Sequence, residues 1–225
     1  MKPWNVIGKT GAPGGNQLTL YEHDGEYVLR VGGRELMSTR RTASEVRLAG
    51  LGCQGLMRLP KVRVLIGGLG LGFTLRAALA AVGRDAEVVV AELLPAVLEW
   101  NQNHALPLAA KELSDQRTRV VLGDVMDTLK AQSGAWDAIL LDADNGTTAM
   151  MTRGNRALYE TRGLATVHAA LRPGGRVVYW SAEPDDRFAK RMAQSGFQVT
   201  SELVRAYGTG GPKHQLLLGL KVSKA

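Results

Sequence analysis

VRVLIGGLGLG (Val62–Gly72) joins a continuous apolar run, Val62–Gly68, to a glycine-rich turn that ends at Gly72. Apolar runs of this kind form strands that are buried on both faces of a parallel sheet. The next residues, FTLRAALAAVG (Phe73–Gly83), have the pattern of a helix that ends at Gly83. A buried strand, a glycine turn and a helix are together typical of a doubly wound α/β sheet.

Strands and helices continue to alternate towards the C-terminus. The apolar runs predict strands at Glu87–Leu93, Arg117–Asp124, Trp136–Asp144 and Arg176–Ala182. Helical spacing and end signals predict helices at Pro95–His104, Val125–Gln132, Tyr159–Leu171 and Asp185–Ser195. A closing antiparallel pair is expected at Phe197–Val204 and His214–Val222. We therefore predict an α/β, Rossmann-like fold whose doubly wound sheet is mostly parallel and has an antiparallel closing strand.

The first 40 residues have a different pattern. Segments rich in β-branched and aromatic residues predict a small β-meander at Leu18–Asp24, Glu26–Gly32 and Arg34–Ser38. Tight turns are expected at Asp24-Gly25 and Gly32-Gly33. Thr42–Leu51 then changes to helical spacing. We expect residues 1–40 to form the meander and residues 41–225 to form one Rossmann-like domain.

The composition is that of an ordinary globular chain. It has 225 residues, of which 45% are hydrophobic, and a chain of this length can bury a sizeable core without disulfides or metals. Its lone cysteine, Cys53, cannot form an internal disulfide, and its four histidines have no metal-ligand spacing. There is no apolar segment of signal-peptide or membrane-spanning length. We expect a cytoplasmic protein with no metal site and no membrane contact.

Positive charge is concentrated in the C-terminal third of the chain. The net charge is +7, and residues 147–225 carry 12 Lys and Arg against 5 Asp and Glu. These basic residues are scattered singly and are not interleaved with aromatic residues. The pattern favours a solvated surface over a nucleic-acid interface.

The glycine turn contains Gly68, Gly70 and Gly72 in the spacing G-x-G-x-G. Glycines let the backbone approach a ligand closely, and the following helix presents free N–H groups to an anionic or electron-rich group. The dinucleotide fingerprint G-x-G-x-x-G is not met, because Phe73 stands three residues after Gly70, and no P-loop lysine follows Gly72. G-x-G-x-G is typical of nucleoside-binding methyltransferase folds, although a purely structural turn would have the same glycines.

Two acidic residues stand at the ends of the next two predicted strands. Glu92 ends the second strand, where a carboxylate can accept hydrogen bonds from both hydroxyls of a ribose. Asp124 ends the third, where it can accept from an adenine amino group while the backbone at Val125 contacts the ring. Either acid alone is equally consistent with a surface carboxylate. Because ligands of such sheets bind at the carboxyl ends of the strands, the glycine turn and both acids predict an adenosine site.

The fourth predicted strand ends in LDADNG (Leu141–Gly146), beside the glycine turn. An amine that attacks a sulfonium carbon must lose a proton, and a carboxylate here can hold the ammonium and accept that proton. Asp142 is therefore the predicted catalytic residue. A turn or helix-capping role is the alternative for an aspartate in such a position.

Five stretches resemble, in order and spacing, the spermidine synthase family of aminopropyltransferases, a branch of the class I S-adenosylmethionine-dependent methyltransferase fold. They are VLIGGLGLGFTLRAAL, VVVAELLPAVLEW, VVLGDVMDTL, WDAILLDADNG and LYETRGLATVHAALRPGGRVVYW. The resemblance covers about residues 17–205. It implies that Glu92 holds the ribose, that Asp124 holds the adenine and that Asp142 is the catalytic acid and base. A small-molecule acceptor is expected, with a homodimer as a possible assembly.

Several positions depart from the family's pattern. The family has an aspartate where Leu71 stands, a diamine-binding aspartate where Asn145 stands, and Tyr-His-Glu where this chain has Ala43-Ser44-Glu45. A polyamine pocket must compensate buried ammonium groups, and the candidate substrate-binding residues left for this are Glu45, Asp144 and Asn145. Intact S-adenosylmethionine carries a carboxylate that the aminopropyl donor lacks. The missing acid at Leu71 therefore favours the intact cofactor.

The leading interpretation is S-adenosylmethionine-dependent methyl transfer to a small molecule. The first alternative is an aminopropyltransferase, a polyamine synthase that uses decarboxylated S-adenosylmethionine. An RNA methyltransferase that uses the basic C-terminal surface, an NAD-dependent oxidoreductase and a non-catalytic nucleoside-binding module stay open as further alternatives.

Overall fold

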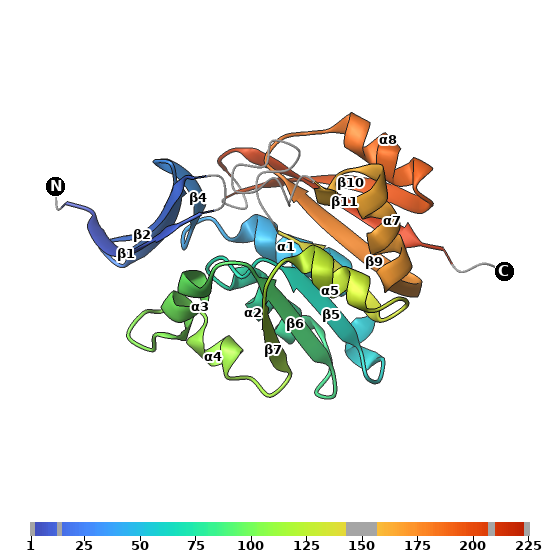
Figure 1. The fold of residues 1–225 in the computed structure, drawn as a ribbon, viewed down its shortest axis with the longest axis horizontal. Coiled ribbons are helices and arrows are strands. Elements are labelled where there is room, and N and C mark those ends of the chain that lie inside the picture. Colours follow the sequence, from blue (N-terminus) through green and yellow to red (C-terminus); the bar gives the residue numbers. More distant parts are fainter. Residues whose placement is uncertain (1–2, 13–14, 143–156, 207–209, 223–225) are drawn as a thin grey trace.

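The computed structural model describes residues 3–12, 15–142, 157–206 and 210–222. Two β-sheets form its framework, a four-stranded sheet near the N-terminus and a seven-stranded sheet that is flanked by helices (Figure 1). The α/β class expected from the alternating pattern is confirmed.

The four-stranded sheet is an antiparallel meander of β1 (Asn5–Gly11), β2 (Gln17–His23), β3 (Glu26–Val31) and β4 (Arg34–Ser38). Both expected turns are present, and φ is positive at Asp24 (48°), Gly25 (80°), Gly32 (54°) and Gly33 (81°). Positive φ at both central residues is the signature of a two-residue type I′ hairpin. Strand β1 was not expected, because this edge strand contains two glycines and has no buried residue that would mark an apolar alternation.

The seven-stranded sheet has the order β10-β11-β9-β8-β5-β6-β7. Its strands are β5 (Arg63–Gly67), β6 (Glu87–Glu92), β7 (Thr118–Leu122), β8 (Trp136–Leu141), β9 (Leu171–Ser181), β10 (Phe197–Arg205) and β11 (Lys213–Lys221). Strands β5 to β9 pair in parallel, whereas β11 runs antiparallel to both β9 and β10. This is the mostly parallel sheet with an antiparallel closing strand that the sequence predicts.

Helices cover both faces of this sheet. They are α1 (Ala43–Gly52), α2 (Phe73–Ala81), α3 (Pro95–Gln102), α4 (Ala110–Leu113), α5 (Val125–Ala131), α7 (Thr161–Ala170) and α8 (Asp186–Gln194). A 3-10 turn spans Leu56–Arg58. Successive residues of β5 point into two separate apolar cores. Val64 and Ile66 belong to one core, and Leu65 belongs to the other. The central strands are thus buried on both faces, as continuous apolar runs predict.

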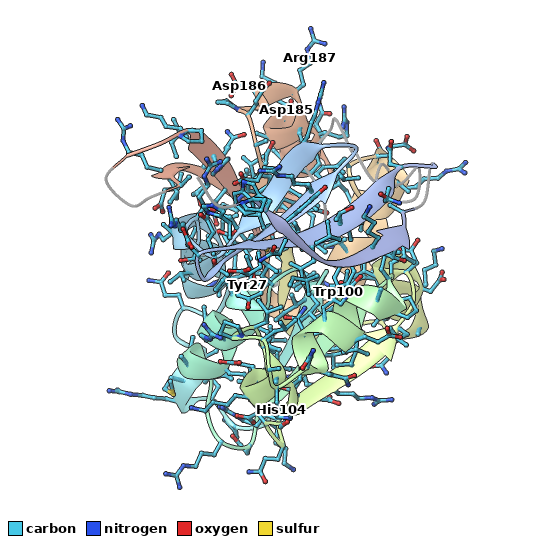
Figure 2. The ribbon with its side chains drawn as sticks, turned by 90° about the vertical axis from the view of Figure 1, so that its left-hand side faces the viewer. Tyr27, Trp100, His104, Asp185, Asp186 and Arg187 are labelled. Carbon is cyan, nitrogen blue, oxygen red and sulfur yellow. The ribbon has the colours of Figure 1, made fainter. Side chains whose placement is uncertain are left out.

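The small sheet shares a core with the large one. Leu20 and Leu29 of the meander belong to the same buried cluster as Leu71 and Val97 of the Rossmann-like part. Trp100 of α3 points towards the small sheet (Figure 2), and a side chain at Gly8 in β1 would collide with its indole ring. The meander therefore packs directly on the glycine turn and α3. The division of the chain into domains at residues 40 and 41 remains a prediction.

Strand β9 begins several residues before its predicted start. Strand β9 starts at Leu171, so Arg172-Pro173-Gly174-Gly175 lies inside the strand, whereas the sequence predicts a helix stop there and a strand from Arg176. The pairing of β8 with β9 shifts register between Trp136 and Ala138, which accommodates the extra residues as a bulge. Proline and glycine are tolerated in strands at such irregular positions.

Cys53 is 2% exposed, and burial raises the pKa of its thiol to about 12. A thiol that stays protonated at neutral pH is a poor nucleophile and metal ligand. Within the described ranges, no cluster of three or more His, Cys, Asp or Glu side chains could hold a metal ion. The same ranges contain no helix that is long and apolar enough to span a membrane.

Candidate functional site

The centre of the large sheet is a topological switch point. The chain moves outward from β5 to β6 and β7 and then returns to β8 on the other side of β5. Open α/β sheets bind ligands outside the carboxyl ends of the strands at such a point. Gly67, the last residue of β5, pairs with Leu141, the last residue of β8. The glycine loop that follows β5 and the Asp142 that follows β8 therefore leave the sheet at neighbouring positions.

The glycine loop has a backbone that only glycine adopts easily. Gly68, Gly70 and Gly72 have φ of 94°, 54° and 82°, which is the left-handed region that disfavours residues with a Cβ. Gly72 N–H donates to Leu69 O at 2.8 Å and closes the turn. A Cβ on Gly70 would lie 2.8 Å from Met37 Sδ. The loop thus presents bare backbone, as the G-x-G-x-G spacing predicts.

Gly72→Ala is expected to lower the free energy of unfolding by about 2–5 kcal/mol, combining backbone strain at positive φ with overpacking. The added methyl group would collide with Ala109 Cβ. Urea unfolding of Gly50→Ala provides the matched control, because Gly50 lies in α1 with nothing within 4 Å of an added Cβ. That substitution should raise stability by up to about 1 kcal/mol. Equal stability of the two variants would show that the loop tolerates a side chain.

Glu92 connects the end of β6 to the glycine loop. The residue is 6% exposed, its Oε2 accepts from Leu69 N–H, and its Oε1 accepts from Leu94 N–H, each at 2.8 Å. Both carboxylate oxygens therefore hold backbone N–H groups, one in the glycine loop and one just before α3, and contact with a ribose remains a proposal. Glu92, the residue predicted to bind the ribose, therefore also holds the glycine loop in place. The sequence alone does not indicate this second role.

Asp124 is the N-cap of α5. Its Oδ1 accepts from Met126 N–H at 2.8 Å, a bond that stabilises the first turn of a helix. The side chain of Val125 lies beside the end of β5, since a Cβ on Gly67 would come within 3.2 Å of its Cγ2. The structure thus gives Asp124 a capping role and places Val125 next to the glycine loop. Their contact with an adenine remains a proposal.

Two large apolar side chains are exposed at the same edge of the sheet. Leu93 follows Glu92 and is 39% exposed, and Leu122 ends β7 and is 54% exposed. Exposed apolar side chains next to buried polar groups are typical of small-molecule sites, where they contact the flat faces of a ligand. Sequence reasoning missed them because both leucines read as ordinary strand residues.

Asp142 is tied to the helix that follows the glycine loop. Thr74 Oγ1, in the first turn of α2, donates to Asp142 Oδ2 at 2.9 Å. Thr74 is 2% exposed, so its hydroxyl is held in place and orients the carboxylate. The glycine loop, Glu92 and Asp142 therefore form one connected group, through Leu69 on one side and Thr74 on the other.

Glu45, one of the predicted substrate-binding residues, has a hydrogen bond from its neighbour within α1. It is 6% exposed in the first turn of α1, and Ser44 Oγ donates to its Oε2 at 2.6 Å. Burial raises the pKa of Glu45, and the Ser44 hydrogen bond opposes that shift. Asp144 and Asn145 lie outside the described residues. The substrate-binding role of all three remains a prediction.

Glu45→Gln is expected to make the chain more stable at pH 8 by about 1–3 kcal/mol, because the neutral amide avoids the desolvation cost of a buried charge. Because the folded-state pKa of Glu45 is raised, the folded chain binds more protons than the unfolded chain, and stability is lost as pH rises above the unfolded value. The difference should vanish near pH 4, where the carboxyl is neutral. Urea unfolding at pH 4, 6 and 8 measures it. Glu99→Gln, at an exposed position of α3, is the control and should be as stable as the parent at pH 8. A Glu45→Gln variant that is no more stable than the parent at pH 8 would contradict the expectation.

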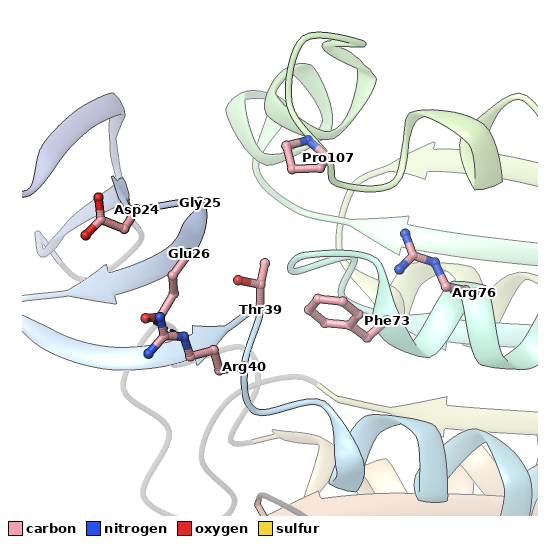
Figure 3. A pocket seen from close by; sticks show the side chains of 8 residues that line it. All are labelled: Asp24, Gly25, Glu26, Thr39, Arg40, Phe73, Arg76 and Pro107. Carbon is pink, nitrogen blue, oxygen red and sulfur yellow. Dashed lines mark ion pairs between the residues drawn. The ribbon is translucent and has the colours of Figure 1, made fainter.

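A cavity of about 420 Å³ lies between the small sheet and α2 (Figure 3). Its lining includes Phe73 and Arg76 of α2 and the ion pair between Arg40 and Glu26, whose Nε and Oε2 are 3.1 Å apart. Arg76 Nε also pairs with Glu112 Oε1, at 2.6 Å. None of the predicted site residues lines this cavity. Arg40 and Glu26 pair with each other and Arg76 pairs with Glu112 outside the lining, so we do not include the cavity in the candidate site.

Leu71 is 1% exposed and belongs to the apolar core. Its side chain therefore packs away from solvent, and only its backbone is presented by the loop. The sequence argument that its missing carboxylate favours intact S-adenosylmethionine assumes a side chain that faces a ligand. The packing of Leu71 gives that argument no support.

The loop and its surroundings fit an adenosine group. The glycines leave a bare backbone, Glu92 places a carboxylate beside the loop, and Leu93 and Leu122 offer apolar contact for a base.

No family model matches the chain. Among curated proteins, it is 30% identical over 146 residues to a polyamine aminopropyltransferase of Mycobacterium tuberculosis and equally to that of Mycobacterium bovis, covering 61% of this chain and 27% of theirs. An uncharacterized protein of Methanocaldococcus jannaschii is 28% identical over 129 residues, which cover 57% of this chain and 41% of that protein. The chain thus spans about a quarter of the length of the mycobacterial relatives that it matches.

Solved structures of spermidine synthases have the same fold over nearly the whole chain. The enzyme from Thermotoga maritima superposes with a TM-score of 0.77, and a spermidine synthase in complex with the transition-state analogue AdoDATO superposes with 0.76. Each is 18% identical and covers 96% of this chain and 72% of the other. The chain therefore has the fold of the spermidine synthases, a class I methyltransferase-like fold, as the resemblance in the sequence implies, and part of it is similar in sequence to polyamine aminopropyltransferases.

Proposed function

We propose that the chain is a spermidine synthase-like transferase that binds an adenosyl sulfonium nucleoside and transfers an alkyl group from it to an amine. The observation that carries the proposal is the connected group at the switch point, in which Glu92 holds the glycine loop and Thr74 orients Asp142. The similarity to polyamine aminopropyltransferases and spermidine synthases supports it.

The residues of this chain would act in two ways. Glu92 binds the ribose hydroxyls and, through Leu69 N–H, keeps the loop against the nucleoside. Asp142 holds the acceptor ammonium, takes its proton and leaves a lone pair free to attack, while the Thr74 hydroxyl fixes the orientation of the carboxylate. The sulfonium supplies an electrophilic carbon. When the nitrogen bonds to that carbon, the carbon–sulfur bond breaks and its electron pair stays on sulfur.

The comparisons favour an aminopropyl donor over a methyl donor. The matched curated proteins are named polyamine aminopropyltransferases, and the side chain of Leu71 packs in the core, so the case for methyl transfer built on it has no structural support. We therefore place decarboxylated S-adenosylmethionine first and S-adenosylmethionine second, the reverse of the order inferred from the sequence. The methyl donor stays as the second candidate because Asn145 replaces a family aspartate.

The nucleoside product distinguishes the two donors. The chain should be incubated with putrescine and either decarboxylated S-adenosylmethionine or S-adenosylmethionine, and the products separated by mass. Aminopropyl transfer releases methylthioadenosine together with spermidine, whereas methyl transfer releases S-adenosylhomocysteine together with a methylated amine. We expect methylthioadenosine to form in step with spermidine. Release of S-adenosylhomocysteine with a methylated product would instead support the second candidate, and no turnover with any amine would support a binding module.

A further inference from the structure

Asn101 is a polar side chain in the apolar interior of the candidate site. It lies near the end of α3 and is 1% exposed. Its amide nitrogen donates to Val97 O, one turn back in the helix, and to Gly70 O in the glycine loop, each at 2.8 Å. One side chain therefore joins α3 to the loop.

The bond to Gly70 has a counterpart on the other side of the same peptide group. Leu71 N–H donates to Met37 Sδ at 3.2 Å, from β4 of the small sheet. The carbonyl of Gly70 and the N–H of Leu71 belong to one planar peptide unit. Asn101 and Met37 hold its two ends, so the orientation of this peptide is fixed by side chains and not by the loop itself.

The loop has no polar side chain of its own that could fix the orientation of this peptide. Gly70 and Gly72 have positive φ, and glycine has the largest conformational freedom to lose when a backbone becomes ordered. Asn101 Oδ1 is buried and has no hydrogen-bond partner among the described residues. The amide of Asn101 is therefore used for its two N–H donors alone, and only one of these serves the helix.

We propose that Asn101 is a positioning residue that presets the peptide between Gly70 and Leu71 for nucleoside binding. This inference rests on the proposed function, because it concerns the same site. A preset loop binds its ligand without ordering at that moment, so loss of the bond weakens affinity. Asn101 would affect the nucleoside only indirectly, through the loop that its amide contacts.

Asn101→Asp tests the proposal with almost no change in volume. An ionised carboxylate cannot donate to Gly70 O, whereas a protonated one regains a single O–H donor. We expect the full chain carrying this variant to bind methylthioadenosine at least tenfold more weakly than the parent at pH 7.5. At pH 5, the affinity of Asn101→Asp for methylthioadenosine should come closer to that of the parent. Gln102→Ala, an exposed neighbour on the same helix, should bind as tightly as the parent at both pH values.

A merely structural role for Asn101 predicts a different result. Affinity within twofold of the parent at pH 7.5, or a loss of affinity that does not change with pH, would overturn the proposal. Asn101→Leu keeps the apolar packing if the aspartate variant does not fold, and it should lose affinity equally at both pH values. Unchanged affinity in that variant would also overturn the proposal.

Amide hydrogen exchange separates this inference from the proposed function. If the unaltered chain binds no sulfur nucleoside, the proposed function fails, but the exchange rate of Leu71 N–H still reports on the loop without a ligand. Faster exchange in Asn101→Asp than in Gln102→Ala supports the positioning role. Equal exchange in the two variants contradicts it.

Discussion

Replacing Asp142 by asparagine is expected to slow group transfer by a factor of about 10²–10⁴, the usual contribution of a general base. Asparagine has nearly the same shape, and its side-chain oxygen can still accept from the Thr74 hydroxyl that contacts Asp142 Oδ2 at 2.9 Å. It has no charge to hold an ammonium and cannot take its proton. Single-turnover formation of the alkylated amine measures the loss, and nucleoside affinity should stay close to that of the parent.

Two further variants define the role of Asp142. Asp127→Asn removes a carboxylate whose side chain is 78% exposed and pairs with Lys130 at 3.5 Å, and it should leave the rate unchanged. Thr74→Val keeps the buried volume but removes the orienting hydroxyl, and it should slow transfer less than Asp142→Asn does. A parent rate retained by Asp142→Asn would show that another group takes the proton, and the proposed mechanism would fail.

Replacing Glu92 by alanine has the second largest expected effect. The carboxylate accepts from Leu69 N–H and Leu94 N–H, each at 2.8 Å, in a buried position. Removing it strands both donors, at a cost of about 1–3 kcal/mol each. We expect the free energy of unfolding to fall by about 2–6 kcal/mol and methylthioadenosine affinity to fall at least tenfold. Urea unfolding and calorimetric titration measure the two effects.

Glu92→Gln distinguishes the two roles of Glu92, holding the loop and binding the ribose. The amide oxygen of glutamine can still accept one backbone bond, so this variant should unfold at higher urea than Glu92→Ala while its nucleoside affinity stays reduced. Glu99→Ala, on the exposed side of α3, should change neither quantity. Parent-like stability and affinity in Glu92→Ala would show that neither the backbone bonds nor the ribose depends on this residue.

The sequence predicts the framework of this chain well because its signals are local. Apolar runs indicate β5, β6 and β8. The pair Asp24-Gly25 indicates a type I′ turn, because such a turn requires positive φ at both residues and Asp-Gly adopts it readily. Strand β1 and the start of β9 were missed because their glycines and Pro173 read as loop signals. In both places, pairing with a neighbouring strand overrides the local preference.

The sequence predicts several residues of the candidate site but not the hydrogen bonds that join them. Strand-end position alone indicates Glu92 and Asp142. The hydrogen bonds that join them to Leu69 and Thr74 depend on how β5, β6 and β8 are arranged in space. Asn101 gives one faint signal, a polar residue one turn after the buried Val97. Met37 gives none, since it reaches the loop from a separate sheet.

Titration of the unaltered chain by calorimetry tests the central claim, an adenosyl sulfonium site at the switch point. Methylthioadenosine, decarboxylated S-adenosylmethionine, S-adenosylmethionine and NAD should be compared under the same conditions. We predict that the sulfur nucleosides bind, with the decarboxylated form tighter than the intact one, and that NAD does not bind. Binding of NAD without binding of any sulfur nucleoside would contradict the account and favour an oxidoreductase.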